Sequence, residues 1–196
     1  MPVPQILKSI VGYRLGLTRA DRLVIGQRNR GIALAVPYVA GAASAAVTNT
    51  VTETLFDKNY TFPANTLEPE MVIKLKWQGI ATATNATDTL AIRVRIGGLA
   101  GTLLFTHAAT DVANNDVFSG EYELVIRTIG VTGTVVGFGT GKAVAAAEGT
   151  ATYKDDILAS TTIDTTAAQL VGVTAQWSVA NAGNSCRLDF FKVEIA

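Results

Sequence analysis

The chain has 196 residues, one histidine, one cysteine and a formal net charge of zero, with 48% hydrophobic and 16% charged residues. This length suits one domain plus an arm, and the composition excludes a coiled coil, a collagen and a charged disordered chain. Because mean hydropathy is +0.30 with so few charges, a lone folded domain would expose apolar surface. We therefore expect a homotrimer that covers it.

The N-terminal segment is basic. Six basic residues and one acidic residue give residues 1–30 a net charge of +5, so the remainder carries −5. A basic segment on an acidic body is typical of electrostatic docking, although a solvated tail is the alternative. We expect residues 1–47 to form a docking arm and linker. Its docking residues would be Arg14, Arg19, Arg22, Arg28 and Arg30.

Residues 31–52 carry no charge, and the run GIALAVPYVAGAASAAV is similar to a signal-peptide core or a membrane span. However, the run is rich in Ala and Gly, contains Pro37, and follows a basic region much longer than that of a signal peptide. We therefore expect neither a membrane partner nor an export signal.

The rest of the chain, residues 48–196, alternates apolar and polar residues with the period of a half-buried strand. The clearest runs are 71–78, 90–96, 121–128 and 171–179, and the weaker ones are 51–56, 102–107 and 134–140. The last run, 186–195, changes phase at Phe190-Phe191, which predicts a β-bulge or two buried faces. About eight strands with short turns predict an all-β jelly-roll β-sandwich, with a plain Greek-key sandwich as the alternative.

No catalytic motif stands out. His107 and Cys186 lie within strand-like runs and are expected to be core residues. The glycines at 137, 139 and 141 continue a strand and open no helix, so they do not predict a phosphate-binding loop. We expect no enzyme activity, no cofactor and no nucleic-acid partner.

The remaining candidate sites are acidic pairs, indoles and one polar loop. Glu121 with Glu123 is expected on a solvated strand face, and Asp155 with Asp156 on a turn, so neither pair predicts a glycosidase. The two tryptophans, Trp77 and Trp177, are expected in the core. The loop 111–116 collects oxygen ligands that suit Ca²⁺, but a turn is the preferred interpretation and no metal is predicted.

One stretch resembles a known family. Residues 59–98 read NYTFPANTLEPEMVIKLKWQGIATATNATDTLAIRVRIGG. This is similar to a segment of tailed-bacteriophage virion jelly-roll proteins. The matching positions are Tyr60, Phe62, Pro63, Ala64, Asn65, Leu67, Thr87, Leu90, Arg93, Gly97 and Gly98. The family commonly has Gly where this chain has Pro69-Glu70, and the runs 122–127 and 186–195 are also similar.

The resemblance implies a structural virion protein made in the host cytoplasm. One hypothesis is a trimeric capsid decoration, or cement, protein whose N-terminal arm binds the major capsid protein at the capsid surface. The alternative is the receptor- or carbohydrate-binding head of a phage fiber or tail protein. In that case the arm would bind a tail or baseplate protein, and the loops 108–117 and 180–185 would contact a host glycan.

Overall fold

The computed structural model describes residues 37–196, apart from residue 86 and residues 145–150. Within this part of the chain there are eleven β-strands and no helix, and hence no helix long and apolar enough to cross a membrane. The strands are β1 (Tyr38–Ala40), β2 (Val47–Thr48), β3 (Thr54–Phe62), β4 (Val72–Thr82), β5 (Thr89–Ile96), β6 (Thr102–Asp111), β7 (Asp116–Thr128), β8 (Gly133–Val144), β9 (Ala151–Ile163), β10 (Gln169–Trp177) and β11 (Ser185–Ile195). The predicted all-β class is confirmed.

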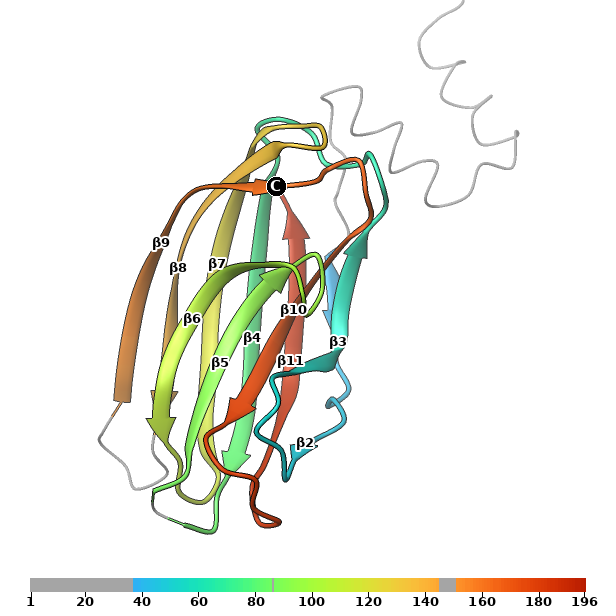
Figure 1. The fold of residues 1–196 in the computed structure, drawn as a ribbon. Helices are drawn as coiled ribbons and strands as arrows, with labels where there is room; N and C mark the ends of the chain where they lie inside the picture. The colour runs from blue at the N-terminus through green and yellow to red at the C-terminus, as the bar shows by residue number, and fades with distance from the viewer. Residues whose placement is uncertain (1–36, 86, 145–150) are drawn as a thin grey trace, which may run out of the picture. The chain divides into compact units, whose positions relative to one another are not determined.

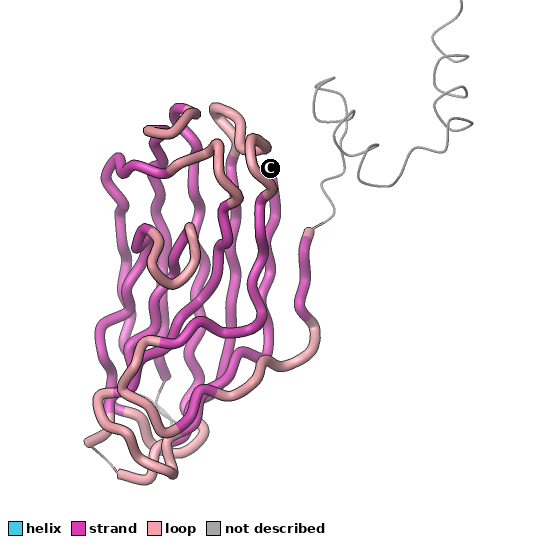
Figure 2. The backbone as a smooth tube through the Cα atoms, turned by 45° about the vertical axis from the view of Figure 1, so that its right-hand side comes forward, coloured by secondary structure: helices cyan, strands magenta, loops and turns pink. Residues whose placement is uncertain are grey.

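The strands form two antiparallel sheets that pack face to face, as Figures 1 and 2 show. The seven-stranded sheet has the order β1-β11-β4-β7-β8-β9, with β2 also paired to β11, and the four-stranded sheet has the order β3-β10-β5-β6. Strand β4 pairs with β11 in one sheet while β5 pairs with β10 in the other. This nesting of pairs from the two ends of the chain is typical of a jelly roll.

The strand count differs from the prediction in two places. Strand β9 was missed. Residues 38–47, which were expected in the arm and linker, contribute β1 and the first residue of β2 along β11. The pair Asp155 and Asp156 was expected on a turn, which is wrong, because both residues lie in β9. The charges at 154–156 interrupt the apolar alternation of β9, and a strand at the edge of a sheet needs no continuous apolar face.

The predicted change of phase in the last strand is confirmed as a β-bulge. The pairing of β11 with β4 shifts register between Leu188 and Phe190. The extra residue turns both Leu188 and Phe191 into the core, where each is fully buried. The alternation before and after the bulge therefore serves the same buried face.

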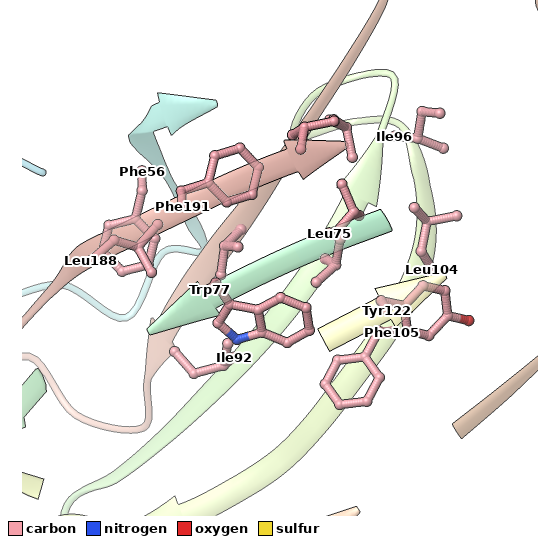
Figure 3. Close-up of a cluster of buried hydrophobic side chains, with 14 of the residues drawn as sticks. Phe56, Leu75, Trp77, Ile92, Ile96, Leu104, Phe105, Tyr122, Leu188 and Phe191 are labelled. Carbon is pink, nitrogen blue, oxygen red and sulfur yellow. The ribbon is translucent and has the colours of Figure 1, made fainter. Parts of the chain in front are cut away.

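Aromatic side chains fill the centre of the sandwich, as Figure 3 shows for Trp77, Phe105 and Tyr122. The ring centroids of Trp77 and Phe105 lie 5.6 Å apart, and those of Phe105 and Tyr122 lie 5.8 Å apart. Trp77 and Trp177 are both buried, as the sequence predicts. These spacings suit tilted and edge-to-face contacts, which add to the free energy gained by burial alone.

The glycines of β8 make room for two of these rings. Gly137, Gly139 and Gly141 alternate along the buried face of the strand. A Cβ atom at 137 or 139 would collide with the ring of Tyr122, and one at 141 would collide with the ring of Phe105. The repeated glycine is therefore a packing feature that lets large side chains lie directly against the backbone.

Candidate functional site: the outer face and free edge of the seven-stranded sheet

The single histidine and single cysteine are structural, as the sequence predicts. His107 is buried, with Nδ1 3.0 Å from the carbonyl oxygen of Ala108 and Nε2 3.3 Å from that of Thr152. Cys186 is 1% exposed, and burial raises the pKa of its thiol to about 12. A thiol in this environment is protonated at neutral pH and is a poor nucleophile.

The loop at residues 111–116 forms a turn between β6 and β7. The Asp116 carboxylate accepts a hydrogen bond from the amide of Ala113 at 2.8 Å, and Asn115 has a positive φ of 61°. In the part of the chain that the structure describes, no group of three His, Cys, Asp or Glu side chains is placed to hold a metal ion. The hydrogen bond from Ala113 to Asp116 stabilises the backbone of this turn.

The outer face of the seven-stranded sheet carries rows of paired charges. Lys74 Nζ lies 3.2 Å from Glu123 Oε1, and Lys76 Nζ lies 3.0 Å from Glu121 Oε2. Both pairs connect β4 to β7, where the register places the two partners directly opposite each other. Glu121 and Glu123 thus lie on a strand face that is open to solvent, as predicted, and each is neutralised by a lysine.

A shallow hollow of about 280 Å³ lies over these rows. Its lining is mostly charged. Of its two aromatic residues, Tyr122 is buried and Phe138 is 56% exposed. The charged lining residues are Lys74, Lys76, Lys192, Glu121, Glu123 and Glu194. Because three lysines face three glutamates, the hollow has no net charge and offers donors and acceptors to a polar ligand.

Apolar side chains gather beside this hollow on the last two strands of the sheet. Phe138 on β8 lies directly opposite Ile157 on β9, and Ile157 is 83% exposed. Tyr153, also on β9, is 69% exposed and lies opposite Lys142, whose Nζ is 5.5 Å from its ring centroid. We name Phe138, Tyr153 and Ile157 the β8–β9 strip.

The β8–β9 strip was missed by sequence reasoning because the strand that carries two of its members was missed. The alternation of apolar and polar residues that could have predicted β9 was weak. Tyr153, Asp155 and Ile157 do alternate with Lys154 and Asp156, but neither set is uniformly apolar. The β-branched residues that follow, at 161–163, were the better indication of a strand.

The outer face of the four-stranded sheet holds a different charged cluster. Glu53 accepts two hydrogen bonds from Arg95, at 2.7 and 2.9 Å, and one from the Thr174 hydroxyl at 2.6 Å. Arg93 Nη1 lies 3.5 Å from the same carboxylate, and the side chains of Glu53, Arg93 and Arg95 are 18–20% exposed. The Arg95 guanidinium, assisted by Thr174, holds the pKa of Glu53 below its usual value against the opposing effect of burial.

The five arginines predicted to dock, Arg14, Arg19, Arg22, Arg28 and Arg30, lie outside the described residues. Their part in docking stays a prediction. The candidate site that the structure adds is therefore the outer face and free edge of the seven-stranded sheet.

Comparison with known proteins shows no family for this chain. No protein-family model matches the chain, and no curated protein matches it. Among solved structures, the chain is similar to the CBM2 module of Lactobacillus casei BL23 phage J-1 evolved Dit, with 13% identity and a TM-score of 0.33 over 69% of this chain and 67% of that one. It is also similar to the Emp47p carbohydrate recognition domain, with 8% identity and a TM-score of 0.29 over 81% of this chain and 87% of that one.

Proposed function

We propose that the protein is a non-enzymatic structural component of a bacteriophage virion, a trimeric capsid decoration protein. Its basic arm binds the major capsid protein, and its β-sandwich covers the capsid surface. The proposal is supported by the charge of residues 1–30 and by the resemblance of residues 59–98 to phage virion jelly rolls.

The structural observation that supports assembly of copies is the β8–β9 strip. Its three large apolar side chains are 56–83% exposed in a single chain. A protein that remains alone in water gains nothing from such a surface, whereas an assembling protein buries it against a partner. The charged rows beside the strip are neutral overall and are compatible with close packing of copies.

Binding to particles tests the arm directly. We expect the protein with all five docking arginines replaced by Gln to lose most of its binding to capsids that lack this protein, measured by co-sedimentation. Charge-assisted contacts of arginine to carboxylate and carbonyl oxygens would be removed. The matched control removes five cations from the sandwich by replacing Lys58, Lys74, Lys76, Arg187 and Lys192 with Gln. Equal binding by both variants would contradict docking through the arm.

A second candidate function, the receptor- or carbohydrate-binding head, is favoured by the hollow on the seven-stranded sheet. Exposed Phe138 beside a row of Lys and Glu side chains could stack against a sugar ring and donate hydrogen bonds to its hydroxyls. Electron microscopy of labelled particles separates the two functions. Copies distributed over the shell support decoration, and a few copies on the tail support the binding head.

A further inference from the structure

We propose that β9 is an isologous interface, at which two copies of this chain pair antiparallel about a two-fold axis through Asp155. The inference goes beyond capsid docking and does not depend on it. It joins the seven-stranded sheets of two copies into one continuous sheet.

The first observation is the open edge of β9. This strand pairs with β8 on one side and is the last strand of its sheet, as Figure 1 shows. Side chains of β6 reach the backbone of β9 near its two ends, where His107 lies by the carbonyl of Thr152 and Thr102 donates to the carbonyl of Thr162. Near the middle of the strand, Lys154 Nζ lies 5.9 Å from the ring centroid of Phe105. In the part of the chain that the structure describes, no strand pairs with the second edge of this 13-residue strand.

The second observation is the self-complementarity of the sequence YKDDI at 153–157. With Asp155 on the axis, Tyr153 lies opposite Ile157 of the other copy. Lys154, whose Nζ is 3.4 Å from Asp156 Oδ2 within its own chain, also lies opposite Asp156 of the other copy, so the two copies would form a four-charge network. Each pair occurs twice because the interface is isologous. Aromatic–aliphatic pairs and pairs of opposite charge are those that stabilise adjacent antiparallel strands.

The neighbouring registers lack these pairs. An axis through Lys154 places that lysine against itself and Tyr153 against Asp155. An axis through Asp156 places that carboxylate against itself and Asp155 against Ile157. In a continuous sheet, directly opposite residues of two strands face the same side, so the two-fold axis must lie between two copies of one residue rather than between neighbouring residues. Of the three registers compared, only the one centred on Asp155 pairs opposite charges.

On the outer face of the seven-stranded sheet, the pairing centred on Asp155 also aligns side chains of β8. Phe138 on β8 lies opposite Ile157, so the proposed pairing makes a row of Phe138, Ile157, Tyr153 of the second copy and Lys142 of the second copy. This row brings Ile157 and Tyr153 of the β8–β9 strip against side chains of the second copy and makes one continuous row with Phe138. The cost is one unfavourable contact, because the two copies of Asp155 meet at the axis.

A two-fold contact is distinct from the predicted homotrimer and compatible with it. If the chain also forms trimers, the β9 contact joins one trimer to a neighbour. If it does not, the contact makes dimers. Disruption of β9 should therefore reduce dimers to single chains, or linked trimers to separate trimers.

The charge pairs provide the first test, read by light scattering of the full-length chain. We expect Lys154→Asp to weaken association at least tenfold, and Lys154→Asp combined with Asp156→Lys to restore it, because the pairs re-form with reversed sign. We expect Asp155→Asn to strengthen association. Circular dichroism checks that each variant is folded. Unchanged association in the single variant, or failure of the double variant to restore it, overturns the proposal.

Cross-linking tests the register. Cysteine at 155 is placed against itself at the axis, so Asp155→Cys should form a disulfide-linked dimer on oxidation, whereas Tyr153→Cys should not, because it faces Ile157. The native Cys186 is buried and does not compete. A dimer with Tyr153→Cys and none with Asp155→Cys would refute this register, whereas capsid binding through the arm would be unaffected.

Discussion

The two outer faces of the sandwich use the same kinds of charge in opposite ways. On the seven-stranded sheet, Lys76 and Glu121 pair at 3.0 Å with side chains 60% and 62% exposed. On the four-stranded sheet, Arg95 and Glu53 pair through two hydrogen bonds with side chains only 18% and 19% exposed. Water competes for the first pair and is largely excluded from the second.

The difference shows which charges hold the fold together. Glu53 lies just before β3, and the side chains that hydrogen-bond to it come from β5 and β10. The cluster therefore fixes the segment before β3 to its sheet. A charge removed from such a cluster leaves its partners desolvated and unpaired. When a charge is removed from the exposed rows, water solvates the partner that is left. Those rows remain available for contacts with other molecules.

The largest effect is expected from Glu53→Gln. Glutamine keeps the shape but cannot accept two charge-assisted hydrogen bonds, so Arg93 and Arg95 lose their counter-charge. We expect the free energy of unfolding, measured with urea, to fall by about 2–3 kcal/mol. Glu121→Gln on the opposite face is the matched control and should change it by less than about 0.5 kcal/mol. Equal effects of the two variants would remove the contrast between the faces.

An intermediate effect is expected from pH. Because the pKa of Glu53 is lowered in the folded state, its contribution to stability is complete above the ordinary value of 4.5 and is lost as pH falls through the folded-state value. The wild type should therefore lose more stability than Glu53→Gln between pH 6 and about pH 3. Urea titrations of both proteins across this range measure the difference, and parallel curves would show that Glu53 is not responsible.

Sequence reasoning found what depends on neighbours in the chain and missed what depends on distant partners. Alternation located the central strands, the buried Trp77 and Trp177, and the bulge before Phe190, because burial of one face dictates period two. Strand β9 was not predicted, because an edge strand need not bury one continuous apolar face and so need not show this alternation. The Glu53 cluster escaped because its members, at 53, 93, 95 and 174, come together only through the sheet pairing of β3, β5 and β10.

The smallest effect is expected from the pair Lys76 and Glu121. A double-mutant cycle with alanine at both positions should give a coupling energy of about 0.2–1 kcal/mol at low salt, since two exposed side chains gain little attraction and lose rotamer freedom. Raising the salt to about 1 M, where the Debye length is about 3 Å, should reduce this coupling toward zero. The same cycle with Arg95 and Glu53 should keep most of its coupling in salt, because ions cannot enter a contact that is four-fifths buried. Coupling of the Lys76 pair that persisted in salt would mean that the exposed row is shielded from solvent, as it would be if another molecule covered this face.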